Sequence, residues 1–283
     1  MHITQVSHIG GDDMAVFITG DIHADPFRLS SSNFPIGKHL TREDYVIICG
    51  DFGCVWSLDS RDDINLNWLA KKPFTVLFVD GNHENFDKLY QYPEKDWHGG
   101  RVHEIRPNVL HLMRGYVFDI QGHSFFCMGG AMSHDIDNGV VIEGNRHQHT
   151  ATVLKRVRNP FGDKYEDAFV ESEITNYIPS RIFFRHLGLS WWLQELPTRE
   201  EIKRAEESLA KVNNTVDFVI THDCPGIATY QLGQHPDPSY LVQFFDSLFV
   251  NLKFKHWYFG HHHEDKDVFM NIHAMFESIV QVL

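Results

Sequence analysis

Side chains that can bind metal ions or transfer protons follow five separate apolar runs in this chain of 283 residues. They comprise two carboxylates, one amide and five imidazoles: Asp21, His23, Asp51, Asn82, His83, His222, His261 and His263. Oxygen and imidazole donors without thiolate suit Mn²⁺, Fe or Zn²⁺. Each residue alone has an ordinary explanation, because an aspartate can cap a helix and a lone histidine usually lies at the surface. Five such groups in the same position after a strand are hard to obtain by chance, so we interpret them as one metal site.

The five apolar runs have the composition of buried strands. They span residues 15–19, 45–49, 74–79, 216–220 and 255–259. Continuous apolar runs of this length are typical of parallel sheets. In open α/β sheets, ligands bind at the carboxyl ends of the strands. The sequence therefore predicts that the five groups lie at that edge.

Three segments have the spacing of helices. Apolar residues at positions 86, 89 and 90 follow the turn Asp80-Gly81-Asn82-His83-Glu84, and a short helix is predicted around residues 65–69. Thr198 and Glu201 have the spacing of a capping box, which predicts the start of a third helix.

The remaining segments are less regular. Residues 109–112, 116–120 and 124–128 predict an antiparallel meander, because glycine-containing turns separate them. Residues 134–190 show no clean period over a length that compact domains rarely leave irregular. We interpret residues 134–190 as an insertion that forms a cap or rim within a single domain of residues 1–283. The tail, residues 268–283, is expected to complete a second sheet.

Composition restricts the function. The formal net charge of −13 argues against general attraction to long nucleic acids. No apolar run approaches the ~20 residues of a membrane span, and the start lacks the features of a signal peptide. The four cysteines form no Cys-x-x-Cys pair and are expected to be free thiols. We therefore expect a soluble cytoplasmic protein without a membrane partner; the oligomeric state is left open.

The order of the motifs resembles that of the calcineurin-like metallophosphoesterases. That family has Asp-x-His, Gly-Asp, Gly-Asn-His-Asp/Glu, a distant His and Gly-His-x-His. Here they are Asp21-Ile22-His23, Gly50-Asp51, Gly81-Asn82-His83-Glu84, His222 and Gly260-His261-His262-His263. The resemblance spans residues 20–263 and implies a four-layer α/β/β/α sandwich, a fold of the α/β class.

The resemblance also implies a role for each residue. One divalent metal ion would be held by Asp21, His23, Asp51 and His263. The second would be held by Asp51, Asn82, His222 and His261, with Asp51 as the bridge. His83 would be catalytic rather than a ligand, facing the scissile phosphate and protonating the leaving oxygen. Mn²⁺ is the metal expected to support activity in vitro, with Fe and Zn²⁺ as alternatives.

One departure from the pattern concerns the residues after Asp51. Protein Ser/Thr phosphatases of the superfamily continue with a second aspartate and then Arg-Gly. This chain continues with Phe52-Gly53-Cys54-Val55-Trp56, so both features are missing. The departure argues against a phosphoprotein phosphatase and leaves the partner of His83 open, with Glu84, Asp80 and Asp223 as candidates.

Several further residues have two interpretations each. His134 and Asp135 either reach the substrate or cap a loop, and Arg114 could approach the site. His147 and His149 are expected in solvent, and the cluster Lys155, Arg156 and Arg158 is interpreted as a solvated face rather than a phosphate grip. Trp191-Trp192 is expected to pack between insertion and core, and His262 to point away from the metals.

The expected function is that of a dinuclear metal-dependent phosphoesterase, a hydrolase acting on ester bonds. Two metals about 3.5–4 Å apart lower the pKa of a shared water and clamp phosphoryl oxygens, so in-line attack by a bridging hydroxide is expected. The expected substrate is a small, soluble, nucleotide-like phosphodiester. Alternatives are a phosphomonoesterase or protein phosphatase, a nuclease of the same fold, and an inactive protein-binding scaffold.

Overall fold

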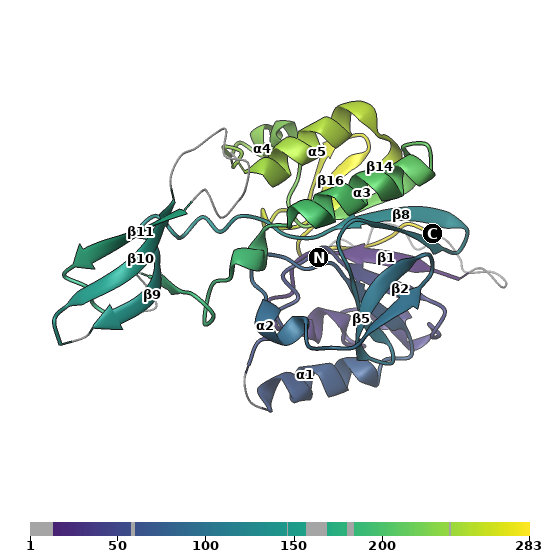
Figure 1. The fold of residues 1–283 in the computed structure, drawn as a ribbon. Helices are drawn as coiled ribbons and strands as arrows, with labels where there is room; N and C mark the ends of the chain where they lie inside the picture. Colours follow the sequence, from purple (N-terminus) through teal and green to yellow (C-terminus); the bar gives the residue numbers. More distant parts are fainter. Residues whose placement is uncertain (1–13, 58–59, 146, 157–168, 180–183, 238) are drawn as a thin grey trace.

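The computed structural model describes residues 14–57, 60–145, 147–156, 169–179, 184–237 and 239–283. Two mixed β-sheets lie face to face, and helices cover the outer face of each (Figure 1). The layers follow the order α/β/β/α, so the predicted α/β sandwich is confirmed.

The first sheet has seven strands in the order β17-β1-β2-β3-β6-β5-β4. Their bounds are Ile279–Gln281 for β17, Val16–Thr19 for β1, Tyr45–Ile48 for β2, Thr75–Phe78 for β3, Val109–Leu112 for β6, Gly100–Arg106 for β5 and Glu94–Trp97 for β4. Strands β1, β2, β3 and β6 are parallel to their neighbours in this run. The register aligns Ile18 with Ile47 and Ile47 with Leu77, so the strands end at nearly the same level.

The second sheet has six strands in the order β15-β16-β14-β13-β8-β7. Their bounds are Lys266–Phe269 for β15, Ile272–Ala274 for β16, Lys253–Phe259 for β14, Thr215–Thr221 for β13, His123–Met128 for β8 and Tyr116–Ile120 for β7. Strands β8, β13, β14 and β16 are parallel. This sheet therefore also presents several carboxyl strand ends at one edge.

Helices α1 (Arg61–Ala70) and α2 (Phe86–Leu89) cover the first sheet. Helices α3 (Arg199–Lys211), α4 (Gly226–Gln231) and α5 (Tyr240–Asn251) cover the second. Short 3₁₀ turns at Pro26–Leu29, Pro35–Lys38 and Leu193–Glu195 lie in the connections. The predicted capping box of α3 is present, because Thr198 and Glu201 exchange side-chain and backbone hydrogen bonds.

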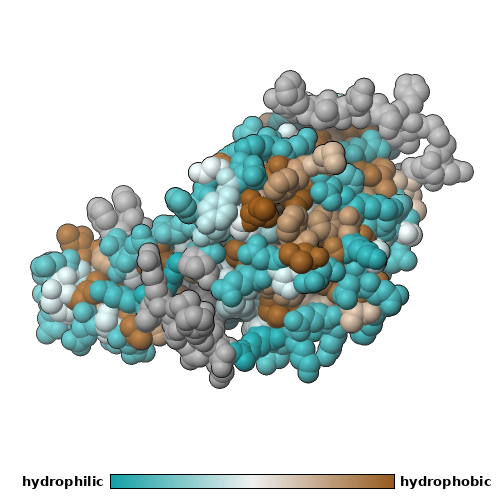
Figure 2. All heavy atoms as spheres, turned by 90° about the horizontal axis from the view of Figure 1, so that it is seen from above, coloured by the Kyte–Doolittle hydropathy of each residue, from teal (hydrophilic) through white to brown (hydrophobic). Residues whose placement is uncertain are grey.

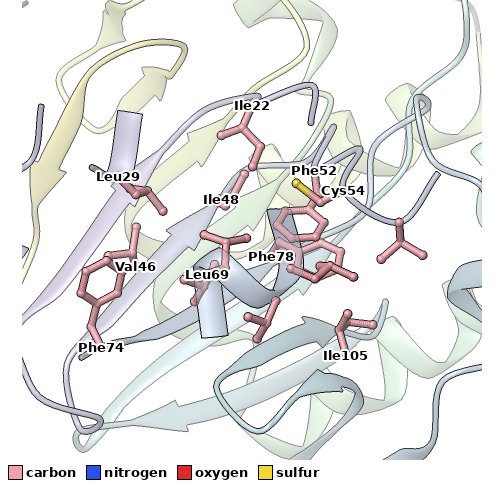
Figure 3. Packing of buried hydrophobic residues seen from close by; sticks show 14 of the residues in the cluster. Ile22, Leu29, Val46, Ile48, Phe52, Cys54, Leu69, Phe74, Phe78 and Ile105 are labelled. Atoms are coloured by element: carbon pink, nitrogen blue, oxygen red, sulfur yellow. The ribbon is translucent and has the colours of Figure 1, made fainter. Parts of the chain in front are cut away.

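Three apolar layers hold the sandwich together. The inner one joins the two sheets through residues such as Ile47 and Ile220, and the outer ones lie under the helices. Figure 3 shows the layer outside the first sheet, where Phe52 and Cys54 lie next to Phe78. The rings of Phe52 and Phe78 stack with centroids 4.0 Å apart. The residues that replace the phosphatase motif after Asp51 thus contribute to the hydrophobic core.

The predicted meander was wrong in its pairing. Residues 109–112 form β6 of the first sheet, between β3 and β5, whereas β7 and β8 pair with each other in the second sheet. Strands β4 and β5 were not foreseen, because β4 is polar and half exposed and lacks an apolar alternation. The tail is divided: β15 and β16 join the second sheet as expected, and β17 joins the first.

Residues 134–190 contain a sheet that the sequence did not reveal. Strands β9 (Val140–Asn145), β10 (Thr150–Arg156), β11 (Phe169–Thr175) and β12 (Arg185–His186) form a four-stranded sheet that projects from the sandwich (Figure 1). Its own core is small, with Val141, Ala151, Val153 and Tyr177. So few buried positions leave little hydrophobic pattern to detect. Its role as a cap or rim stays a prediction.

The tryptophan pair at 191–192 joins this segment to the sandwich. Trp191 packs with Ile136 and Val140 of the insertion, whereas Trp192 belongs to the layer outside the first sheet. The predicted packing role is therefore confirmed.

On the face seen in Figure 2, hydrophobic side chains lie in patches among hydrophilic ones. Ile227, Tyr230 and Val250 of α4 and α5 are among the large apolar or aromatic side chains exposed to solvent. Within the described ranges, every helix is too short or too polar to cross a membrane.

Candidate metal centre

The loops after five strands bring the predicted site residues together where the two sheets meet. Strands β1, β2 and β3 lie side by side in the first sheet and lead to Asp21, Asp51 and Asn82. Strands β13 and β14 lie side by side in the second and lead to His222 and His261. Contacts between the two sets span up to 240 residues of sequence.

Glycine allows these loops to approach so closely. A Cβ atom on Gly50 would lie 2.1 Å from Nδ1 of His222, and Gly50 has φ +97°. A Cβ on Gly81 would lie 2.0 Å from Oδ1 of Asp51. Asp51 itself has φ +44°, a left-handed conformation that costs energy in a non-glycine residue and concentrates at functional sites.

A first group of donors comprises Asp21, His23, Asp51 and His263, whose ligand atoms lie within 4.8 Å of one another. Nε2 of His23 is 2.9 Å from Nε2 of His263, and the latter nitrogen is 3.2 Å from Oδ2 of Asp21. Nδ1 of His23 is 3.7 Å from Oδ2 of Asp51. Two imidazole nitrogens and two carboxylates that converge in this way fit a divalent cation.

A second group lies on the other side of Asp51. Nε2 of His222 is 3.3 Å from Oδ1 of Asp51 and 3.2 Å from Oδ1 of Asn82. The ring of His261 lies 5.1 Å from that of His222. Asp51 thus offers Oδ2 to the first group and Oδ1 to the second, the arrangement that a bridging ligand requires.

Hydrogen bonds orient the ligand atoms of the second group. The Nδ1–H of His222 donates to the carbonyl of Cys49 at 2.8 Å, which directs Nε2, the atom that would bind a metal, toward Asp51. The amide nitrogen of Asn82 donates to Oγ of Ser133 at 3.2 Å, and that hydroxyl donates to the buried Glu195 at 2.6 Å. Asn82 therefore turns its oxygen, not its nitrogen, toward the group.

Buried negative charge makes the site attractive to cations. Asp21 and Asp51 are each only 1% exposed. Burial opposes the charged form of His222, but Asp51 and Asp21 outweigh it and raise the pKa of His222 to about 10. Burial likewise opposes ionisation of Asp51, yet His222, His83 and His23 hold its pKa below the ordinary value. These charges compensate one another, and the first donor group suits a divalent ion.

The comparison with protein families agrees with this geometry. The family model for calcineurin-like phosphoesterases matches residues 14–265. The chain belongs to the calcineurin-like phosphoesterase family. Membership makes it a metal-dependent phosphoesterase by class and confirms the resemblance found in the motifs. No curated protein matches the sequence.

In this phosphoesterase, His83 lies next to the first donor group without joining it. Its ring centroid is 5.6 Å from that of His23, and its backbone N–H donates to Oδ1 of Asp51 at 2.8 Å. Burial lowers the pKa of His83, Asp51 counteracts this, and the positive charge of Arg185 lowers it further. The turn that carries His83 is thus attached directly to Asp51.

The three carboxylates suggested as partners of His83 have other roles, and among the described residues none hydrogen-bonds to its ring. Glu84 is fully buried and accepts the backbone N–H groups of Phe52 and Gly53 at 2.7 and 3.2 Å. Asp223 accepts the backbone N–H of Cys224. The partner of His83, which the sequence left open, is therefore neither of these two carboxylates in this structure.

Asp80, the third of these carboxylates, is buried at the start of the turn and is held by two side chains. It accepts hydrogen bonds from Nε of Arg114 at 2.8 Å and from Nε2 of His111 at 2.9 Å. Burial opposes its ionisation, but Arg114 and His111 hold the pKa of Asp80 below its ordinary value. Arg114 is 2% exposed and serves this buried ion pair, so it does not reach into the site.

His134 reaches the site. Its Nε2 lies 3.1 Å from Nε2 of His261, and the two rings stack. The neighbouring Asp135 pairs with Arg185 of β12, whose Nε donates to it at 2.8 Å. Arg185 had no sequence signal, because it lies in the segment without period. Ser133 could have been found from its position after β8, by the same strand-end rule as the ligands.

The other residues singled out in the sequence lie outside the two donor groups or outside the described residues. His147 and His149 are exposed at the turn between β9 and β10. Arg156 forms an ion pair with Asp237 at 3.6 Å, while Arg158 lies outside the described residues. His262 is outside the two donor groups: its Nδ1 lies 2.8 Å from Oε1 of Gln234 and its Nε2 lies 3.5 Å from Oδ1 of Asp223.

We predict that Ser133→Ala weakens metal binding at the second group, because Asn82 loses the acceptor that fixes its orientation. Loss of such a supporting hydrogen bond typically costs 10–100-fold in metal affinity or activity. A Mn²⁺ titration of the apoprotein measures the change, with the exposed Ser32→Ala as control. Unchanged affinity at both sites would show that Ser133 does not orient Asn82.

Proposed function

We propose that the protein is a dinuclear metal-dependent phosphoesterase that hydrolyses a small, soluble, nucleotide-like phosphodiester. The observation that carries the proposal is the position of Asp51, whose two oxygens face two separate donor groups. Asp21, His23, Asp51 and His263 would hold one ion, and Asp51, Asn82, His222 and His261 the other. When bound, the two ions would activate water and offset the charge of the phosphoryl oxygens.

The chain's own residues would supply the remaining chemistry. His83 is placed beside both Asp51 and His23, where its ring can donate a proton to the leaving oxygen. Burial lowers the pKa of this imidazole and Asp51 opposes that change, and histidine is the side chain most often used for such proton transfer. Glu84 accepts hydrogen bonds from the backbone N–H groups of Phe52 and Gly53. These bonds hold the loop after Asp51 and so support the left-handed backbone conformation of Asp51.

A small substrate is favoured by the space next to the site. A pocket of about 330 Å³ opens beside His23 and His83, a volume at the lower end of ordinary ligand sites. The net charge of −13 disfavours long nucleic acids. The four cysteines are buried and free, which supports a reducing, cytoplasmic location.

The proposal is tested by hydrolysis of bis-p-nitrophenyl phosphate with Mn²⁺, before and after removal of metal by a chelator. We expect activity that disappears on chelation and returns with Mn²⁺. Activity that persists in metal-free protein would refute the dinuclear mechanism. A panel of phosphomonoesters, cyclic nucleotides and dinucleoside polyphosphates would then identify the preferred class of substrate.

We further predict that Arg185→Ala lowers kcat/KM, because the positive charge of Arg185, which acts on His83, would also offset the charge of phosphoryl oxygens there. Loss of one such electrostatic contact costs on the order of 100-fold. The control is Asp135→Asn, which weakens the anchor of Arg185 but keeps its charge, and a smaller loss is expected. An Arg185→Ala variant with the wild-type kcat/KM would exclude a phosphate contact.

A further inference from the structure

Part of the pocket beside His23 and His83 is lined by residues that are neither predicted metal ligands nor the predicted general acid. Besides these two histidines, its lining includes Asp62 and the four residues Trp56, Ser57, Arg61 and Asn65. Those four residues come from the loop after β2 and from the start of α1. A group esterified to a phosphate at the metal site would have this pocket as its immediate neighbour, because His23 and His83 belong to both.

This part of the pocket is rigid. Asp62 accepts the backbone N–H groups of Trp56 and Ser57 at 2.9 and 2.8 Å, and it forms an ion pair with Lys88 at 2.6 Å. The carbonyl of Trp56 accepts a hydrogen bond from the side chain of Asn85 at 2.9 Å. Trp56 and Ser57 are therefore held by a buried carboxylate and by Asn85, which follows the turn that carries His83.

The indole of Trp56 is held by an aromatic contact. The ring of Trp192 meets it edge to face, with centroids 5.4 Å apart and an interplanar angle of 83°. Trp56 is partly buried and lines the pocket. An aromatic ring fixed by its neighbours and open on one side can stack on a planar ligand at low entropic cost.

The pocket also presents polar groups of both signs, Arg61 and Asp62, and Asp62 is already engaged by the backbone of Trp56 and Ser57 and by Lys88. Arg61 brings a positive charge into a protein whose net charge is −13. Asn65 is oriented by donating from its side-chain nitrogen to the carbonyl of Ala24 at 2.6 Å. A stacking surface, a cation and a positioned amide, all next to a phosphate-handling centre, together match a nucleotide.

We propose that this pocket binds the aromatic base of a nucleotide whose phosphate lies at the metal centre, with Trp56 as the stacking surface. The inference rests on the proposed function for the position of the phosphate. It adds the class of the organic group and the residue that selects it. A sugar or glycerol phosphate, which lacks a planar base, would gain no base stacking from Trp56.

The test compares AMP with ribose 5-phosphate, which differ only in the base, by calorimetric titration of the Mn²⁺-loaded protein. Base–aromatic stacking predicts that AMP binds about tenfold more tightly or better. In Trp56→Ala this preference should disappear, with little change for ribose 5-phosphate, and Trp56→Phe should largely retain it. If Trp56→Ala fails to fold, Trp56→Leu keeps apolar volume without an aromatic face and should also lose the preference.

Equal binding of AMP and ribose 5-phosphate to the wild type would overturn the inference, as would a preference that survives both Trp56→Ala and Trp56→Leu. These titrations do not require turnover. Absence of hydrolysis would therefore refute the proposed function separately, while a preference for AMP that depends on Trp56 would still support the base pocket.

Discussion

Asp51→Asn should reduce the hydrolysis of bis-p-nitrophenyl phosphate by on the order of a thousandfold or more, the upper end for loss of one electrostatic group. The reason is that Asp51 is the residue whose two oxygens face both donor groups, at 3.7 Å from His23 and 3.3 Å from His222. An amide has the same shape but lacks the charge, and its nitrogen cannot act as a ligand. Metal analysis should find fewer than two ions per chain.

The matched control is Asp96→Asn, because the side chain of Asp96 is 96% exposed and lies in β4, away from the donor groups. We expect it to keep wild-type activity and metal content. The thermal unfolding midpoint of metal-free Asp51→Asn should be compared with that of metal-free wild type, to separate loss of metal from loss of fold. Substantial activity in folded Asp51→Asn would refute the bridging role.

His83→Ala should retain both metal ions and lower kcat by about 10²–10⁴-fold, the usual range for loss of a general acid. His83 is attached to Asp51 through its backbone N–H, which the substitution preserves. Its imidazole lies beside His23 but outside the first donor group. Metal binding and catalysis are therefore expected to separate in this variant.

Leaving-group dependence provides the specific readout for this role. A substrate with a poor leaving group should lose more rate in His83→Ala than p-nitrophenyl esters do, because p-nitrophenolate departs with little help from an acid. The exposed His147→Ala controls for loss of an imidazole as such. A missing metal ion in His83→Ala would show instead that His83 is a ligand.

Much of the fold and of the site could be predicted because the site residues directly follow buried parallel strands. Parallel strands buried on both faces read as continuous apolar runs, and the residue after each run lies at the carboxyl edge. Asp21, Asp51, Asn82, His222 and His261 were found in this way, without knowledge of pairing. Other strands were missed or misplaced. Strand β4 was missed because it is polar, and the apolar β6 was placed next to β7 although it pairs with β3 and β5 in the first sheet.

The partners of these residues could not be found from local sequence. Glu84 stands next to His83 in the chain but turns toward the loop after Asp51. Arg114 is 34 residues from Asp80, and Glu195 is 62 residues from Ser133. Such hydrogen bonds depend on the direction of each side chain and on how the two sheets and the insertion pack, and neither leaves a periodic pattern.

For this protein, the sequence by itself determined the class of fold, the family and the set of residues at the centre, because residue type and position after a strand suffice for that. Only the tertiary structure decided that Asp51 divides its oxygens between two groups and that Ser133 turns Asn82. It also placed Trp56 in one pocket with His23 and His83. These properties depend on angles and distances between segments far apart in the chain, which arise only when the two sheets and the insertion pack together.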